Sequence, residues 1–330
     1  MNDQSMTPMK VLVTGAGGAA AIAFFKAVRD LTDIEIHMAD MDPFATGLYL
    51  VDQDHRCLLP PGNSGIFSRE LLRYCRTNAI SVVVPTVDCE LAPLAAHRGL
   101  FEAEGTRLVL SPESALKICE DKFKLMEYLW GRVDLVEYSL YDESFSPARF
   151  GYPFIVKPRT GSGSRGVRLI GSASDLAGVP TDGTYLVQAY LPGTEYSVDV
   201  YVSDVGRVVA SVIRERIRVD SGITLVGKTL IDDSISAMAS TIADLVDIRY
   251  VANIQFKLDA KRRPRLLEIN PRFPGSMSLT VAAGVNMPEM CLHEQRGDML
   301  GDTYTYEAVA MFRHWQETFT PVSQFLPSSA

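Results

Sequence analysis

The stretch Leu266-Leu267-Glu268-Ile269-Asn270-Pro271-Arg272 ends a predicted β-strand and brings an acid, an amide and a guanidinium close together. Alternate side chains of a strand share a face, so Leu266, Glu268 and Asn270 are expected on one face. Leu267 and Ile269 are expected on the opposite face. The pattern therefore predicts one polar and one apolar face for this strand.

A second stretch just upstream, Asn253-Ile254-Gln255-Phe256-Lys257-Leu258, alternates in the same way, and Lys261-Arg262-Arg263-Pro264 is typical of a turn. Together the two stretches predict a hairpin. Its apolar face would contain Ile254, Phe256, Leu258, Leu267 and Ile269. Its polar face would contain Gln255, Glu268 and Asn270. Oxygen ligands without His or Cys suit a hard cation such as Mg²⁺, although a solvated edge hairpin fits the same residues.

Composition limits the classes of function. The chain has 330 residues, of which 47% are hydrophobic and 22% charged, which is enough for two or three globular domains. A net charge of −8 argues against nucleic acid or an anionic membrane as a partner. The apolar runs are too short to span a bilayer, and the first ten residues lack the apolar core of a signal peptide.

The cysteines and histidines show no metal-binding pattern. Five scattered cysteines without a CxxC motif are typical of reduced thiols in a cytoplasmic protein. The five histidines have no spacing typical of a metal site, and they are interpreted as structural or exposed; they are His37, His55, His97, His293 and His314.

The first third of the chain alternates between apolar strands and helices. Strands are predicted over 10–14, 34–39 and 81–85, and a helix is predicted over 19–30. Alternation of this kind predicts an open parallel sheet that binds ligands at the carboxyl ends of its strands.

A glycine-rich turn follows the first of these strands. Gly15-x-Gly17-x-x-Ala20, with Asp40 further on, partly matches a dinucleotide-binding fingerprint. The same turn could bind a substrate carboxylate at the helix N-terminus, or serve only as a tight turn. The residues alone leave these three interpretations open.

The middle of the chain has a strand with one lysine, Tyr152–Pro158, followed by the loop Arg159-Thr160-Gly161-Ser162-Gly163-Ser164-Arg165-Gly166. Backbone N–H groups of such a loop can cover phosphates, with Lys157 as the adjacent cation. A flexible hairpin loop is the alternative. Further on, the extended run Leu186–Leu191 leads to Glu195, an arrangement suited to a purine and its ribose.

The order of these motifs resembles the ATP-grasp superfamily over nearly the whole chain. The resemblance rests on Asp121-Lys122, Phe154–Pro158 with its loop, Gln188–Glu195, Asn253–Phe256 and Glu268–Arg272. It implies a mixed α/β and α+β architecture, in which an ATP-grasp fold follows a parallel, Rossmann-like pre-ATP-grasp domain. The implied domains are residues 1–115, a small lid domain over 116–187, and a large domain over 188–330 that carries the hairpin and a C-terminal tail.

The resemblance also implies roles for individual residues. Lys122 and Lys157 resemble the lysines that hold the nucleotide phosphates, and Glu195 resembles the ribose contact. Glu268 and Asn270 resemble Mg²⁺ ligands, with Mn²⁺ as an alternative metal, and Arg272 resembles the arginine at the transferred phosphoryl group. The lid loop would contribute Gly161, Ser162, Gly163, Ser164 and Gly166, and the adenine connector Gln188, Ala189, Tyr190 and Leu191.

One position departs from the commonest family pattern. Many members have a carboxylate where this chain has Gln255, and the ATP-grasp module of carbamoyl-phosphate synthetase resembles this chain instead. A neutral amide oxygen is a weaker metal ligand than a carboxylate, so occupancy of one of two metal sites is in doubt. The chain's length resembles that of a stand-alone ligase relative.

Family membership would imply a specific reaction. A substrate carboxylate attacks the γ-phosphate of ATP to give an acylphosphate, and an amine then displaces phosphate. Substrate contacts are predicted at Glu90, Arg214, Arg216, Gly275 and Ser276, and Arg272 and Lys157 are the predicted catalytic residues. The expected partners are a small carboxylate and amine, with a homodimer as the default assembly. A nucleotide-binding regulatory module without turnover and an NAD(P)-dependent oxidoreductase are the alternatives.

Overall fold

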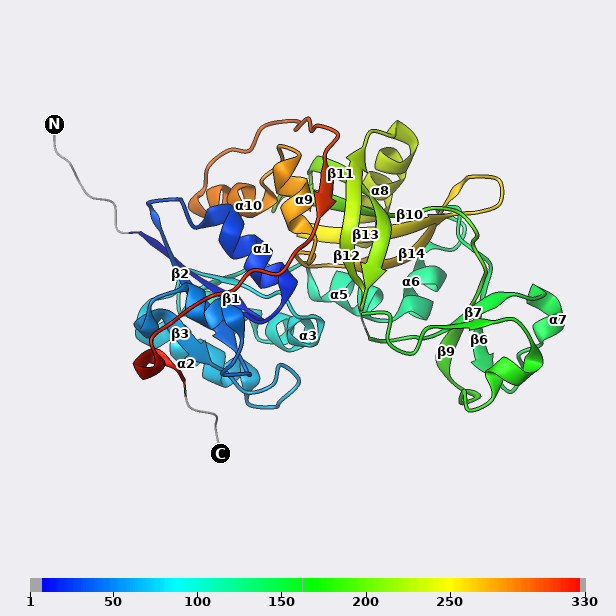
Figure 1. Ribbon diagram of the computed structural model, residues 1–330, viewed down its shortest axis with the longest axis horizontal. Coiled ribbons are helices and arrows are strands. Elements are labelled where there is room, and N and C mark those ends of the chain that lie inside the picture. Colours follow the sequence, from blue (N-terminus) through cyan, green and yellow to red (C-terminus); the bar gives the residue numbers. More distant parts are fainter. Residues whose placement is uncertain (1–7, 162, 327–330) are drawn as a thin grey trace.

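The protein is built around three β-sheets, shown in a computed structural model that describes residues 8–161 and 163–326 (Figure 1). The first sheet is parallel and has the strand order β3-β2-β1-β4-β5. Its strands are β1 (Met9–Thr14), β2 (Ile34–Asp40), β3 (Arg56–Leu58), β4 (Val82–Val84) and β5 (Arg107–Leu108). The predicted parallel sheet is therefore confirmed.

Helices cover both faces of this sheet, because its central strands are apolar on both sides. Val11 and Val13 belong to the same core cluster as Phe24, whereas Leu12 belongs to a cluster with Leu71 on the other face. The helices and 3₁₀ turns of this region are α1 (Ala19–Val28), η1 (Thr46–Leu50), η2 (Gln53–His55), α2 (Phe67–Asn78), α3 (Asp88–Ala96) and α4 (Arg98–Ala103).

The second sheet is small and antiparallel, with the order β6-β9-β7-β8. Its strands contribute Phe154, Val156 and Val187 to a compact hydrophobic core. Its elements are β6 (Tyr138–Asp142), α7 (Pro147–Phe150), β7 (Phe154–Pro158), β8 (Arg168–Ile170), η3 (Ala173–Leu176) and β9 (Asp182–Ala189). Two helices connect the first sheet to the second: α5 (Glu113–Glu120) and α6 (Lys122–Leu129).

The third sheet is antiparallel and has the order β14-β13-β10-β11-β12-β15. Its strands are β10 (Glu195–Val202), β11 (Val208–Asp220), β12 (Ile223–Leu230), β13 (Tyr250–Leu258), β14 (Pro264–Asn270) and β15 (Ala310–Phe312). The remaining elements are α8 (Asp233–Val246), α9 (Met277–Ala282), α10 (Met287–Arg296) and η4 (Val322–Gln324). Figure 1 shows α9 and α10 beside α1, so the third sheet meets the first region there.

The predicted hairpin is present as β13 and β14, but its alternation is wrong at one position. The ladder pairs Gln255 with Glu268 and then Phe256 with Leu266, so a β-bulge leaves Leu267 unpaired. A bulge reverses the faces of the residues that follow it. Leu266 is therefore buried in the core with Ile254 and Phe256, and Leu267 lines the cleft instead.

Candidate active site

A cleft lies between the small sheet and the third sheet, and its lining includes both predicted phosphate lysines. Lys122 is the first residue of α6, where the Asp121 side chain accepts hydrogen bonds from the backbone N–H groups of Phe123 and Lys124. This N-cap fixes the start of the helix. Lys122 Nζ then donates to Gly161 O at 2.7 Å and lies 3.5 Å from Glu268 Oε2. The lysine thus joins the loop to the hairpin.

Lys157 comes from β7 and is the more deeply buried of the two lysines. Its Nζ donates to Leu267 O at 3.1 Å, an acceptor on the bulged segment. Burial lowers the pKa of Lys157 to about 8, because the nearby Glu268 carboxylate offsets only part of the cost and Lys122 adds repulsion. A bound polyanion would remove this deficit of negative charge.

The three predicted metal ligands meet at the polar face of the hairpin. Gln255 stands opposite Glu268 in the ladder, and Asn270 Nδ2 donates to Glu268 Oε1 at 3.3 Å. Burial would raise the pKa of Glu268, but the charges of Lys122 and Lys157 outweigh it and lower that pKa. Gln255 donates through Nε2 to Asn253 Oδ1 at 3.3 Å, which uses its amide N–H groups rather than its oxygen.

The predicted adenine connector also lines this cleft. Gln188 is 2% exposed, and its Nε2 has no hydrogen-bond partner among the described residues. A buried amide donor without a partner is costly, which makes it a candidate contact for a ligand acceptor. Ala189, Tyr190, Leu191 and Glu195 line the same cleft, which has an empty volume of about 870 Å³ including its mouth.

The Gly/Ser loop closes one side of the cleft. Gly161 and Ser164 line the cavity, and Gly163 adopts a φ of 72° against the tip of the β11–β12 hairpin. A Cβ on Gly222 would come within 2.8 Å of Gly163 Cα, so the two backbones touch. Gly166 has a φ of 74° and packs on Pro158. The predicted contact at Ser162 lies outside the described residues.

A second cavity, which shares Gln255 and Glu268 with the lining of the first, lies toward the parallel sheet. It gathers the N-terminus of α1 and the predicted substrate residues. Its lining includes Gly18, Ala19, Ala20, Arg214, Arg216, Asn270, Arg272, Gly275 and Ser276. The structure thus brings together four elements that are distant in the sequence.

Three arginines of this second cavity, Arg214, Arg216 and Arg272, are each held by a carboxylate. Arg214 donates to Asp199 through Nε at 2.9 Å and Nη2 at 2.6 Å, while its buried Nη1 has no partner among the described residues. Arg216 Nε lies 2.9 Å from Glu195 Oε1. The bidentate pair fixes the Arg214 guanidinium before any ligand arrives, whereas Arg216 Nε makes an ion pair without hydrogen-bond geometry.

Arg272 is held from the parallel-sheet side of the cavity. Its Nε and Nη2 each donate to Asp88 at 2.7 Å, a bidentate pair between β14's end and α3. Sequence reasoning missed two site residues, Asp199 and Asn253. Asn253 Nδ2 donates to Asp199 Oδ1 at 2.7 Å. Their inward positions on β10 and β13, on the same faces as Glu195 and Gln255, were the available signal.

Glu90 is separated from the other predicted substrate contacts. It is 7% exposed and accepts a hydrogen bond from the Thr14 hydroxyl beneath the Gly15 turn, whereas its neighbours Asp88 and Cys89 line a cleft. Burial raises the pKa of Glu90 to about 7, with a smaller opposing effect from the Thr14 hydrogen bond. Its predicted contact with a substrate ammonium group stays a prediction.

Asp40 bears on the dinucleotide interpretation. Its Oδ2 accepts a hydrogen bond at 2.8 Å from the backbone N–H of Gly17, and its Oδ1 accepts one from Asp42. In a dinucleotide site this acid would contact ribose. Here it stabilises the glycine turn instead, and the N-terminus of α1 faces the arginine-lined cavity.

Two family models match the chain. Residues 181–317 match a model described as ATP-grasp in the biosynthetic pathway with Ter operon, and residues 11–109 match a PylC-like N-terminal domain. The first match covers the third sheet and the second covers the parallel sheet. Both sheets thus have independent relatives.

Curated relatives include D-alanine–D-alanine ligases from Thermotoga sp. strain RQ2 and Thermotoga maritima. Each is 29% identical over 124 residues, which is 36% of this chain and 41% of the relative. The chain therefore matches about two fifths of the length of these ligases.

Solved structures share the fold over most of the chain. The N5-carboxyaminoimidazole synthetase from Staphylococcus aureus, complexed with ADP, has a TM-score of 0.75 at 17% identity and covers 92% of this chain and 81% of its own. The biotin carboxylase–β,γ-ATP complex from Campylobacter jejuni has a TM-score of 0.70 at 14% identity, with 91% and 73% covered. Among the described residues, no helix is long and apolar enough to cross a membrane.

Proposed function

This chain is an ATP-grasp protein, and from that premise we propose that it is an ADP-forming ligase that joins a carboxylate to an amine. The observation that carries the proposal is that two cavities share Glu268: Lys122 and Lys157 line one, and Arg214, Arg216 and Arg272 line the other. A nucleoside triphosphate suits the lysine-lined cavity, and a carboxylate substrate suits the arginine-lined cavity. Their shared wall is where a phosphoryl group would pass between them.

The first cavity fits ATP by its donors and its charge. Lys157 is buried without full compensation, and the Gln188 amide lacks a partner, so both gain from a bound polyanionic nucleotide. The connector after Gln188 supports a purine at this end. The loop from Gly161 to Gly166 is placed to cover the phosphates with backbone N–H groups.

The hairpin fits a magnesium site by its chemistry. Glu268, Asn270 and Gln255 present oxygen donors without nitrogen or sulfur ligands, which suits Mg²⁺, with Mn²⁺ as an alternative. When bound, the metal would neutralise phosphate charge. The lowered pKa of Glu268 keeps its carboxylate ionised at neutral pH.

The chain's own residues would position the reactants. Lys122 and Lys157 would hold the phosphates. Arg272, which Asp88 holds in place, would stabilise the negative charge on the transferred phosphoryl group. The substrate carboxylate would attack the γ-phosphorus, releasing ADP and forming an acylphosphate. An amine would then attack the acyl carbon and release phosphate.

The arginine-lined cavity supports one class of carboxylate substrate. Arg214 Nη1 is buried and unpartnered among the described residues, and the α1 N-terminus faces the same space. Both favour a substrate with an anionic group beyond the reacting carboxylate, such as an acidic amino acid or another dicarboxylate. Gly275 and Ser276 would contact the same substrate. With five free thiols, a cytoplasmic location is also part of the proposal.

The decisive measurement is ADP release from ATP and Mg²⁺ with pools of amino acids and small acids, with and without hydroxylamine. We expect ADP formation that depends on one acid pool, together with a trapped hydroxamate. Glu268→Gln should abolish turnover, whereas Glu215→Gln, on β11 of the same sheet, should leave it intact. ATP binding without acid-dependent ADP release in any pool would favour a regulatory module, the alternative that Gln255 suggests.

A further inference from the structure

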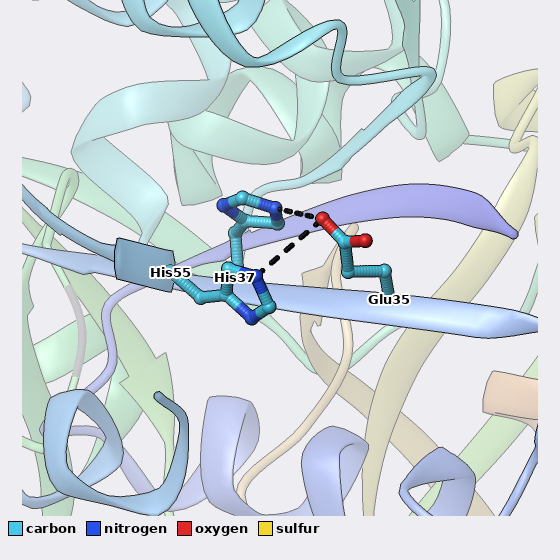
Figure 2. Close-up of side chains that lie close together, drawn as sticks. All are labelled: Glu35, His37 and His55. Carbon is cyan, nitrogen blue, oxygen red and sulfur yellow. Dashed lines mark hydrogen bonds and ion pairs between the residues drawn. The ribbon is translucent and has the colours of Figure 1, made fainter. Parts of the chain in front are cut away.

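Three side chains outside the catalytic clefts form a compact group on the parallel sheet. Glu35 and His37 share one face of β2, and His55 ends the 3₁₀ turn η2 that precedes β3 (Figure 2). Figure 2 shows both imidazole rings directed at one carboxylate oxygen. Glu35 Oε1 lies 2.9 Å from His37 Nε2 and 3.5 Å from His55 Nε2. One ligand atom from each residue lies within 4.8 Å of the others.

The surroundings of His37 favour metal ligation over a surface ion pair. His37 is 2% exposed, and its Nδ1 lies 2.8 Å from the hydroxyl of Tyr74 on α2. When a metal replaces the contact between Nε2 and Glu35, the ring proton moves to Nδ1, where the Tyr74 oxygen can accept it. Metal-binding histidines usually have such an outer contact.

The second ring is oriented by the first. The His37 and His55 ring centroids are 4.4 Å apart with an interplanar angle of 34°. His55 Nε2 also lies 3.9 Å from Asp54 Oδ2, a further carboxylate at the open side of the group. The group therefore has two nitrogens and one oxygen inside, and an exposed acid at its edge.

Lys10 is the cation that currently balances Glu35. Its Nζ lies 2.9 Å from the same oxygen that faces the histidines. Burial acts to raise the pKa of Glu35, but hydrogen bonds from His37 and Lys10 outweigh it and lower that pKa. An incoming dication would have to displace this ammonium group, which is attached by a long flexible side chain.

We propose that Glu35, His37 and His55 form a binding site for a divalent transition metal of the Zn²⁺ class, with water as the fourth ligand. Two imidazole nitrogens and one carboxylate are a known zinc ligand set, and nitrogen donors disfavour Mg²⁺. The bound ion ties η2 to β2 and so fixes the start of the edge strand β3. This site is chemically distinct from the oxygen-only group at Glu268, so the two metals would sort by ligand type.

The test uses the full chain without nucleotide and titrates it with Co²⁺, a spectroscopic substitute for Zn²⁺, followed by Zn²⁺ displacement. We expect one Co²⁺ per chain with the visible absorption of a four-coordinate nitrogen-containing site, unaffected by excess Mg²⁺. His55→Gln and Glu35→Gln should each weaken binding at least tenfold. Lys10→Met should strengthen it, because the competing ammonium group is gone.

A matched control separates this site from ordinary histidine–acid pairs. His293 lies 2.8 Å from Asp298 and 3.7 Å from Glu289, yet it has no second histidine beside it. His293→Gln should leave Co²⁺ binding unchanged. Binding that survives both His55→Gln and Glu35→Gln, or no binding by the wild-type chain at millimolar metal, would overturn the proposal. Because this assay contains no ATP, its result is independent of the proposed ligase reaction.

Discussion

The two cavities that share Glu268 differ in how their cationic side chains are paired with acids. On the nucleotide side, Lys122 and Lys157 both interact with the carboxylate of Glu268, and the pKa of Lys157 is lowered to about 8 by burial. On the substrate side, three arginines each have their own acid. Arg214 pairs with Asp199, Arg216 with Glu195 and Arg272 with Asp88.

This difference indicates what each side requires from a ligand. The nucleotide side has excess positive charge in a buried setting, so a polyanion relieves an unfavourable state when it binds. On the substrate side three arginines are already paired with acids, and bidentate hydrogen bonds hold Arg214 and Arg272 in fixed orientations. An acid bound there gains hydrogen bonds to preorganised donors, and selectivity comes from geometry rather than net charge.

The largest expected effect comes from breaking a paired charge. Arg214→Met would leave Asp199 buried at 0% exposure, with only Asn253 and Thr280 as partners. Removing one member of a buried pair typically costs about 3–5 kcal/mol. We expect a loss of that size in the free energy of unfolding, measured by urea denaturation.

A double variant provides the control for this prediction. Arg214→Met combined with Asp199→Asn removes both charges and should recover most of the stability, because no uncompensated carboxylate remains. The KM for the acid should stay raised, since Arg214 Nη1 is still missing from the cavity. If the single variant is as stable as the wild type, the pair is not the structural unit described here.

The next largest effect has the opposite sign for stability. Lys157→Met should reduce kcat/KM for ATP by about 100-fold, the loss typical for a charged hydrogen bond. The same variant should unfold at higher urea concentration at pH 7, because a cation with a lowered pKa is unfavourable in the folded state. Lys117→Met, which removes an exposed helix pair with Glu113, should change neither quantity.

The pH dependence of this second effect follows from the same pKa. The folded-state pKa of Lys157 is about 8 against 10.5 unfolded, so its destabilising effect is complete below about pH 8. The effect disappears as the pH rises toward 10.5, and the advantage of Lys157→Met should disappear with it. In the wild type, kcat/KM for ATP should fall above pH 8 as the ammonium group loses its proton. An advantage that is constant across this window would contradict the assignment.

Local patterns in the sequence predicted the parts of this site that lie within single elements. Alternation placed Gln255, Glu268 and Asn270 together, and the apolar run around Lys157 placed its strand. The swap of Leu266 and Leu267 was not predictable, because alternation assumes a regular ladder and a bulge depends on the partner strand. The pairing register between β13 and β14 determines where the bulge lies, and neither strand's sequence alone specifies that register.

Contacts between distant elements were also beyond sequence reasoning. Arg272 and Asp88 are 184 residues apart, and only the packing of the parallel sheet on the third sheet joins them. His37 and His55 have no spacing typical of a metal motif, yet the β2–β3 connection returns one ring to the other. Spacing rules detect ligands on one helix or hairpin, and they miss ligands that a loop brings together.

The smallest expected effect concerns the carboxyl group beneath the Gly15 turn. The pKa of Glu90 is raised from 4.5 to about 7 by burial, so the folded protein prefers its protonated form. Stability should therefore fall as the pH rises from about 4.5 to about 7, because the unfolded chain releases this proton first. Glu90→Gln keeps an acceptor for the Thr14 hydroxyl and removes the charge.

We expect Glu90→Gln to match the wild type near pH 4.5 and to exceed it by about 1–3 kcal/mol at pH 8, measured by urea denaturation at both values. Glu102→Gln, an exposed change on α4, should be neutral at both. The kinetic readout separates structure from recognition. A raised KM for the amine in Glu90→Gln would place this carboxyl group in contact with substrate, and an unchanged KM would leave it as a support for the turn that aims α1 at the arginines.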